Sequence, residues 1–249
     1  MYHLRLTLPT PAENLALDEA LFEAAEAGEI AGGVLRLWES PDYCVVLGRS
    51  SRAEVEVNLD ACRREGVPVL RRPSGGGTVL VGPGCLMFAV VLDYQSLPHL
   101  RAVDAAHRFV LERNASALAR HVPGVAHAGI SDLATVQPGS PALKISGNAL
   151  RAKRNHFLYH GTLLYDFALP RIGQLLATPS RTPAYRQDRS HDQFVANLPM
   201  ERELIEQSLI DAWNAHDSLA DWPRERTNDL VVSKYAFSEL ATDDTDERR

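Results

Sequence analysis

Residues 71–79 read RRPSGGGTV, and a second glycine turn, GPG at 82–84, follows before an apolar run resumes. Glycine lacks a Cβ, so three in succession let a ligand approach the backbone closely. The same stretch offers a row of backbone N–H groups that could hold an anion. Arg72 and Ser74 add a fixed cation and a hydroxyl suited to a carboxylate or a phosphate. A tight hairpin with solvated arginines is the alternative for a glycine run that stands alone.

A second polar constellation lies downstream, where Asp132 precedes a short apolar run and residues 144–149 read KISGNA. If Ile145 faces the core, the alternation of a strand turns Lys144 to the opposite side. A lysine in that place suits a charged ligand oxygen, although a lone strand lysine is usually just exposed. His160 begins the segment HGTLL and, taken alone, could be a polar core residue, as Asp132 could be a turn cap.

Composition limits the class of protein. The chain has 249 residues, 45% of them hydrophobic, and a formal net charge of −6, which argues against binding nucleic acid by broad electrostatics. The N-terminus lacks the apolar core of a signal peptide, and no run reaches transmembrane length. Cys44, Cys62 and Cys85 have no metal-ligand spacing, which favours free thiols in a reducing compartment. We therefore expect a cytoplasmic protein that binds neither nucleic acid nor a membrane.

The pattern of elements predicts an α+β fold, with mixed or antiparallel sheets flanked by helices. Thr10 and Glu13 form a capping box around Pro11, which predicts a helix running to about residue 27. Asn58 is expected to cap a short helix that ends at Gly66. Residues 34–38 and 43–47 are expected to form paired strands around the turn SPD at 40–42.

A single catalytic domain is expected over residues 1–249. We expect one helix and a short tail past residue 198, and so no separate C-terminal accessory domain. The charged residues 242–249 are expected to form a disordered tail.

Taken together, these segments resemble the lipoate–protein ligase A family, within the biotin/lipoate protein ligase superfamily. The order of the motifs is distinctive, whereas each motif alone is not. The resemblance implies a catalytic domain similar to that of class II aminoacyl-tRNA synthetases. The matching segments are RRPSGGGTV at 71–79, SDL at 131–133 and KISGNALRAKRNHFLYHGTLL at 144–164, with support from NLALDE at 14–19, VLGR at 46–49, YR at 185–186 and RSH at 189–191.

The resemblance implies an ATP-dependent ligase that activates lipoate or octanoate to an acyl-adenylate. The acyl group then passes to a lysine of a lipoyl domain, in an E2 subunit of a 2-oxoacid dehydrogenase or in the H protein of glycine cleavage. ATP and Mg²⁺ would be required, and some short relatives need a separate accessory protein. The basic run RAKR at 151–154 is a candidate contact for an acidic carrier, or else a solvated loop.

The same resemblance assigns roles to individual residues. Lys144 would be the catalytic lysine that contacts carboxyl and phosphate oxygens, and Asp132 would lie near the nucleotide and its Mg²⁺. Substrate binding would fall to Arg72, Ser74, Gly75, Gly76, Gly77, His160, Thr162 and Trp38, with Val46 as further apolar wall. Nucleotide binding would fall to Asp132, Gly147, Asn148 and Thr78.

Two positions depart from the family pattern, because Ser131 stands where many ligases have asparagine and Val81 where some have histidine. The main rival is an ATP-independent octanoyl or lipoyl transferase, which forms a thioester on a cysteine. No cysteine lies in residues 129–144, where that nucleophile is expected. A biotin ligase ranks third, since its arginine- and glycine-rich loop is absent. A non-catalytic acyl-binding or carrier-binding protein is the alternative outside enzymes.

Overall fold

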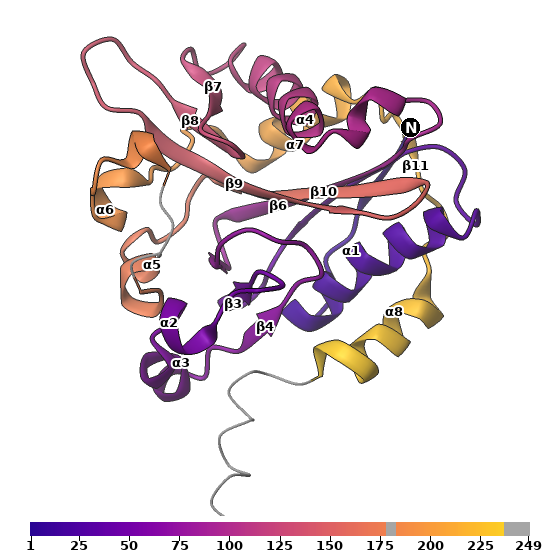
Figure 1. The fold of residues 1–249 in the computed structure, drawn as a ribbon, viewed down its shortest axis with the longest axis horizontal. Helices are drawn as coiled ribbons and strands as arrows, with labels where there is room; N and C mark the ends of the chain where they lie inside the picture. Colours follow the sequence, from indigo (N-terminus) through magenta and orange to yellow (C-terminus); the bar gives the residue numbers. More distant parts are fainter. Residues whose placement is uncertain (178–182, 237–249) are drawn as a thin grey trace, which may run out of the picture.

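The centre of the fold is a mixed eight-stranded sheet, formed within residues 1–177 and 183–236, the part of the chain that this computed structural model describes (Figure 1). β11, β1 and β2 run parallel, whereas the other neighbours pair antiparallel. The α+β prediction is therefore confirmed. In spatial order the strands are β11 (Asp217–Ser218), β1 (Tyr2–Arg5), β2 (Val34–Glu39), β6 (Cys85–Asp93), β10 (His156–Leu164), β9 (Leu143–Ala152), β8 (Asp132–Thr135) and β7 (Val125–Ala128).

A second, three-stranded sheet carries the glycine-rich stretch. Its central strand, β3 (Cys44–Leu47), pairs parallel with β4 (Val69–Arg71) and antiparallel with β5 (Val79–Val81). The glycine stretch thus connects two strands that both flank β3, and it is not the tight hairpin that was the alternative. The expected pairing of residues 34–38 with 43–47 is wrong, because β2 pairs with β1 and β6 in the large sheet.

Helices cover the two faces of the large sheet. On β2, Leu35 and Leu37 belong to the core that includes α4 (Val103–Leu118) and α7 (Arg202–Ala212). Val34 faces the other side, in the core with α1 (Pro11–Glu26). Successive side chains of a strand point to opposite faces, so the almost wholly buried β2 indicates cover on both sides of the sheet. Figure 1 shows α4 and α7 on one face and α1 on the other.

Local capping signals correctly predicted two helices. The Thr10 hydroxyl accepts from the Glu13 amide at 3.2 Å, and the Glu13 carboxylate accepts from the Thr10 amide at 2.8 Å. α1 ends at Glu26, as expected. Asn58 caps α3 (Leu59–Glu65), which stops at Gly66 with a left-handed φ of 65°. Both caps depend on residues within one turn, which is why sequence alone reveals them.

The C-terminal part of the described chain holds more than the one expected helix. After α7 come β11 and α8 (Arg224–Leu230), followed by a π-helical turn at Val231–Tyr235. α8 is polar (RERTNDL) and lacks an apolar stripe, so no periodic pattern of apolar residues predicts it. The expected disordered tail at 242–249 lies outside the described residues. The remaining short helices are α2 (Ala53–Glu56), α5 (Pro170–Leu175) and α6 (His191–Phe194), with 3₁₀ turns at Pro98–Arg101 and Ala184–Arg186.

In residues 1–177 and 183–236, none of the helices has the length and apolar character needed to cross a bilayer.

Candidate functional site

Arg72 holds the glycine loop through hydrogen bonds to its backbone. Its side chain is buried, and one guanidinium nitrogen, Nη2, donates to the carbonyls of Gly75 at 2.7 Å and Gly77 at 2.8 Å. Nη1 donates to the Val46 carbonyl at 3.1 Å, so the loop is tied to β3. Burial lowers the pKa of Arg72 to about 10, which still leaves a cation at neutral pH. In this structure Arg72 shapes the loop, and its direct contact with a substrate stays a prediction.

Ser74 connects the glycine loop to the large sheet. Its fully buried hydroxyl lies 2.5 Å from Nε2 of His160 on β10 and accepts from Arg72 Nε at 3.0 Å. Burial, and then the Arg72 charge, lower the pKa of His160 to about 3, so the imidazole is neutral. The Ser74 proton is free to be donated to Nε2, which places the imidazole proton on Nδ1. That nitrogen is buried and has no hydrogen-bond partner in the described part of the chain.

The glycine loop lies against the middle of β9. Gly76 has a left-handed φ of 86°, and a Cβ on it would come within 3.0 Å of Arg72 Nη2 and 3.7 Å of the Ala149 side chain. A Cβ on Gly75 or Gly77 would meet nothing within 4 Å, so these two glycines border open space. Two segments about seventy residues apart in the sequence therefore meet here.

Thr78, at the end of the loop, is bound to α2 instead. Its hydroxyl donates to Glu56 Oε2 at 2.5 Å, and its amide donates to the same oxygen at 3.2 Å. The predicted nucleotide contact of Thr78 is untested, and Glu56 is a partner that the sequence did not suggest.

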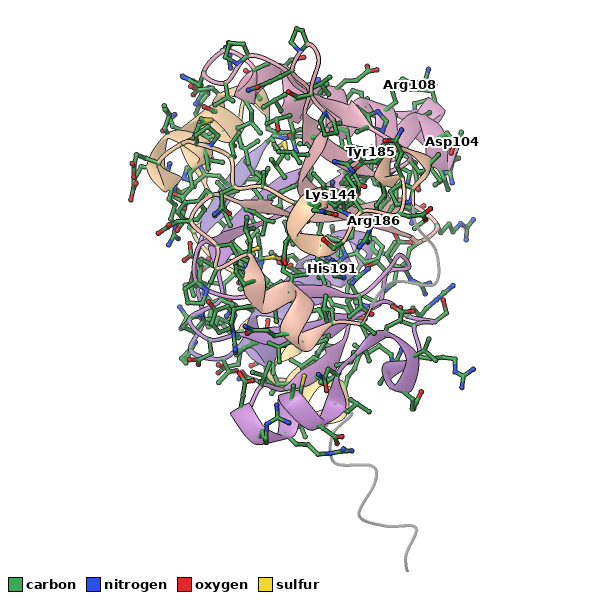
Figure 2. The ribbon with its side chains drawn as sticks, turned by 90° about the vertical axis from the view of Figure 1, so that its left-hand side faces the viewer. Asp104, Arg108, Lys144, Tyr185, Arg186 and His191 are labelled. Atoms are coloured by element: carbon green, nitrogen blue, oxygen red, sulfur yellow. The ribbon has the colours of Figure 1, made fainter. Side chains whose placement is uncertain are left out.

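Lys144 and Asp132 form the charged centre of the site. Lys144 Nζ lies 2.8 Å from Asp132 Oδ1, across the β8–β9 pair. The Lys144 side chain is 27% exposed and Asp132 only 9%, so a ligand can reach the ammonium. Ile145 is fully buried and Lys144 is partly exposed, as predicted for these two neighbours, whereas Leu143 is only partly buried. Tyr185 donates to the second carboxylate oxygen of Asp132 at 2.8 Å. Figure 2 shows Lys144 and Tyr185 on the same side of the molecule.

Gly147, Asn148 and Thr162 surround this centre. The Gly147 amide donates to Thr162 Oγ1 at 3.1 Å. Asn148 Nδ2 donates to the Ser131 carbonyl at 2.8 Å, a backbone contact that does not depend on the side chain at position 131. Gly161 is required beneath Asn148, because a Cβ there would overlap the amide oxygen. Of the residues predicted to bind the nucleotide, Asp132, Gly147 and Asn148 thus lie together on the paired strands β8 and β9, whereas Thr78 contacts α2.

Trp38, like Ser74, is a predicted site residue that is fully buried. It is fully buried in the core cluster that also holds Val46, and its indole donates to Asp18 Oδ2 at 3.2 Å. Its role as an acyl-chain wall stays a prediction. Tyr185 is the residue of this centre to which sequence reasoning gave no role, although the motif YR at 185–186 marked its position.

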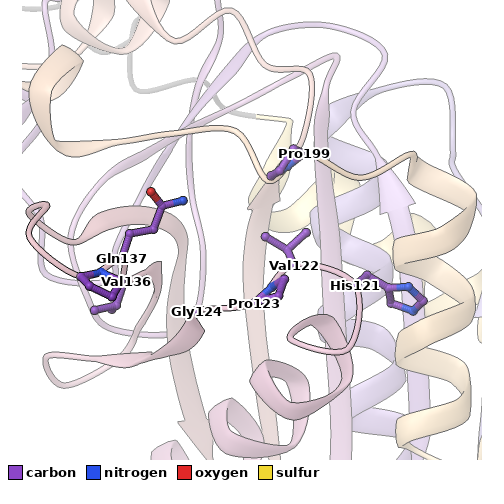
Figure 3. Close-up of a pocket in the computed structure, with 8 residues that line it drawn as sticks. His121, Val122, Pro123, Gly124, Val136, Gln137 and Pro199 are labelled. Carbon is purple, nitrogen blue, oxygen red and sulfur yellow. The ribbon is translucent and has the colours of Figure 1, made fainter.

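An open hollow of about 590 Å³ lies elsewhere, between residues 121–124, residues 136–138 and Pro199 (Figure 3). Its lining holds none of the predicted site residues and offers His121 as its one titratable group. It supplies none of the cations or N–H groups described around the glycine loop.

The three cysteines lack the features of a nucleophile. Cys44, Cys62 and Cys85 are free and buried. Burial raises the pKa of each thiol, so the reactive thiolate is disfavoured at neutral pH.

Known proteins share both the sequence and the fold. The model of the "Lipoyl protein ligase A/B catalytic domain" family matches residues 10–216. A curated protein of Aeropyrum pernix named "Putative lipoate-protein ligase A" is 33% identical over 85% of this chain and 74% of its own length. One of the same name from Schizosaccharomyces pombe is 30% identical over 91% of this chain, which spans 58% of that relative.

A solved structure from Thermoplasma acidophilum extends the similarity to the fold. It is described as a bi-partite lipoate protein ligase with its E2 lipoyl domain, and it aligns with a TM-score of 0.79 at 22% identity, covering 96% of this chain and 94% of that one. Another Thermoplasma acidophilum structure, with bound lipoic acid, aligns with a TM-score of 0.75 at 21% identity, covering 96% and 98%. The chain is therefore an enzyme that belongs to the lipoyl protein ligase A/B catalytic domain family.

Proposed function

We propose that the protein is an ATP-dependent lipoate–protein ligase that forms lipoyl- or octanoyl-adenylate and acylates a lysine of a lipoyl domain. One observation carries the proposal: the glycine loop meets β9, the strand that bears Lys144, through Gly76 against Ala149, and it meets the neighbouring strand β10 through Ser74 against His160. Relatives of the same fold include one with bound lipoic acid and a lipoate-protein ligase A bound with ATP, which supports both substrates.

Adenylate formation joins two anions. The acyl carboxylate attacks the α-phosphorus of ATP, an acyl–phosphate bond forms, and pyrophosphate leaves. Fixed cations and N–H groups lower the repulsion between the two charges. Lys144 would supply the mobile ammonium and the open backbone at Gly75 and Gly77 the amides, while Arg72 keeps the loop in shape.

Acyl transfer then requires positioning more than a strong base. The amine of the carrier lysine attacks the acyl carbonyl, AMP leaves with the electron pair of the broken bond, and the amine proton passes to solvent. The mixed anhydride is already activated, so correct placement of the two reactants contributes most of the acceleration. His160 is neutral and buried, which suits a positioning donor rather than a cation.

The residues present fit Mg²⁺ only together with nucleotide phosphates. No group of three or more His, Cys, Asp or Glu side chains that could hold a metal occurs in residues 1–177 and 183–236. Mg²⁺ commonly uses one or two protein carboxylates with phosphate oxygens and water, and Asp132 is the carboxylate at this centre. When bound, the ion would neutralise phosphate charge.

We infer that the acceptor is the lipoyl domain of an E2 subunit or the H protein. The Thermoplasma acidophilum relative, which pairs a ligase with its E2 lipoyl domain, supports the first. Because that relative is bi-partite, a separate accessory protein for adenylate formation is part of the proposal. We expect activity in the cytoplasm, in keeping with three free cysteines.

The test combines the purified chain, ATP, lipoate and an isolated lipoyl domain. Pyrophosphate release with a mass gain on the carrier lysine is expected from a self-sufficient ligase. If the carrier is modified from synthetic lipoyl-AMP but not from ATP and lipoate, the chain catalyses acyl transfer and the accessory protein is needed for adenylate formation. Transfer only from an octanoylated carrier protein, without ATP, would contradict the proposal and establish the transferase.

A further inference from the structure

Tyr185 is a second hydrogen-bond partner of Asp132, in addition to Lys144. The Asp132 carboxylate has two side-chain partners in the described part of the chain, one on each oxygen. Lys144 Nζ is 2.8 Å from Oδ1, and the Tyr185 hydroxyl donates to Oδ2 at 2.8 Å. Lys144 is a long, partly exposed side chain that a ligand can attract. Tyr185 has only two rotatable side-chain bonds, so its hydroxyl moves far less.

The ring of Tyr185 is held independently of Lys144. It packs on Phe194 of α6, with ring centroids 5.1 Å apart. It also lies over Gly129, where an added Cβ would be 3.1 Å from the ring. The Tyr185 carbonyl accepts from Arg189 Nη2 at 2.8 Å, and Arg189 also donates to a carbonyl that precedes β9. The hydroxyl therefore keeps its place whether or not Lys144 moves.

The Tyr185 hydroxyl remains a neutral donor. A tyrosine hydroxyl ordinarily keeps its proton until about pH 10, and here it donates that proton in a hydrogen bond to the Asp132 carboxylate. A hydrogen bond from a neutral donor to a carboxylate is strong and adds no second cation to the site. The charge balance between Lys144 and Asp132 is thus left intact.

We propose that Tyr185 is a positioning residue, which keeps Asp132 in place when Lys144 leaves that carboxylate for the oxygens of the acyl substrate and nucleotide. The inference rests on the proposed function, because it concerns the movement of Lys144 between two anions. Without the hydroxyl, Asp132 would have Lys144 as its remaining side-chain partner, and the carboxylate would compete with the substrate for the ammonium.

The test is a double-mutant cycle between Tyr185→Phe and Asp132→Asn. Phenylalanine preserves the ring packing on Phe194 and Gly129 and removes only the donor. The rate measured is lipoylation of an isolated lipoyl domain, from ATP and lipoate or from synthetic lipoyl-AMP. We expect Tyr185→Phe to lower kcat about 10-fold with little change in KM for lipoate, as for loss of a hydrogen bond to a charged group. In the Asp132→Asn background the same change should cost less than about 2-fold.

Tyr165 provides a matched control, since its hydroxyl donates to Glu39 Oε2 at 2.6 Å, a carboxylate that is not among the candidate site residues. Tyr165→Phe should leave kcat unchanged, and thermal unfolding should show both single variants folded. Wild-type activity within about 2-fold in Tyr185→Phe would overturn the inference. So would an equal loss in both backgrounds, because Tyr185 would then act independently of Asp132. Wild-type inactivity from both acyl donors would instead overturn the proposed function itself.

Discussion

At the scale of single residues, burial sets the charge states around the glycine loop. Arg72 and His160 are both buried, and Ser74 lies between them. Burial disfavours the charged form of each group. The Arg72 guanidinium stays charged at neutral pH and donates hydrogen bonds to loop carbonyls, whereas the His160 imidazole is neutral. A buried cation therefore supports the glycine loop, and a neutral imidazole of β10 lies beside Ser74.

This neutral histidine predicts a pH dependence of stability. The pKa of His160 is about 3 in the folded protein, against 6.5 for an ordinary histidine. The unfolded chain binds more protons between these values, so His160 favours folding above about pH 6.5 and loses that contribution as the pH falls. The free energy of unfolding should drop by about 3 kcal/mol from this group alone between about pH 7.5 and pH 4.5.

Denaturant unfolding at the two pH values measures the effect. His160→Gln, which keeps a polar partner for Ser74 and cannot titrate, is the comparison. Between about pH 7.5 and pH 4.5, the free energy of unfolding of His160→Gln should fall by about 3 kcal/mol less than that of the wild type. An equal loss in wild type and variant would show that His160 does not titrate as described.

The sequence predicted the orientation of a side chain correctly where neighbouring residues in the chain determine it. Strand alternation correctly turned Lys144 away from the buried Ile145. The contact between Tyr185 and Asp132 spans 53 residues and depends on how α6 and the preceding turn cross the sheet, which no local pattern encodes. The sequence also did not predict the full burial of Trp38, because its hydrogen-bond partner Asp18 is on a helix 20 residues away.

At the scale of elements, the pairing of β9 and β10 positions Asn148, one of the residues predicted to bind the nucleotide. They pair with Gly161 opposite Asn148, and the missing side chain of the glycine makes room for the Asn148 amide. That amide in turn holds the turn before β8 through the Ser131 carbonyl. The position of Asp132, the next residue, thus depends on the fit between two neighbouring strands.

Gly161→Ala should therefore be both destabilising and inactivating. The added methyl overlaps Asn148 Oδ1 and approaches Phe88, so the strand must shift, at a cost of about 1–3 kcal/mol as for other overpacked cores. Thermal unfolding and lipoylation rate are the measurements. Gly173→Ala on α5, whose new methyl would meet only Asp192 at 4.0 Å, is the control and should stay active. Equal behaviour of the two variants would contradict the described packing.

Helix boundaries were predictable at this scale, whereas strand partners were not. Thr10, Asn58 and Gly66 act within one turn and marked α1 and α3 correctly. β2 and β3 were expected to pair because a short turn joins them. In the structure β2 gains partners along its whole length in β1 and β6, and pairing of that kind depends on residues far away in the chain.

At the scale of the whole molecule, a buried polar network joins α1 to the large sheet. Arg36 on β2 is fully buried and donates to Asp18 Oδ1 and to Asn14 Oδ1, both on α1. It also donates to the Leu6 carbonyl at 2.9 Å, beyond the end of β1. The motif NLALDE at 14–19, one of the segments shared with the family, thus holds a helix on the sheet.

Asp18→Ala should destabilise the molecule severely. The change leaves the buried Arg36 guanidinium without its carboxylate and removes the partner of the Trp38 indole. Breaking a buried pair on one side costs about 3–5 kcal/mol. Denaturant unfolding is the measurement, and Asp60→Ala, which removes an exposed carboxylate paired with Arg63, should show little loss. Similar losses in both variants would argue against a structural network.

The central claim is that the glycine loop and the Lys144 strand form one site for an acyl-adenylate. The most direct measurement is single-turnover transfer from synthetic lipoyl-AMP to an isolated lipoyl domain, followed by the mass of the carrier. We predict rapid modification by the wild type, a loss of orders of magnitude in Lys144→Ala with the fold intact, and no loss in Lys234→Ala, whose partner is Glu19 on α1. No acceleration by the wild type, or full activity of Lys144→Ala, would contradict the account.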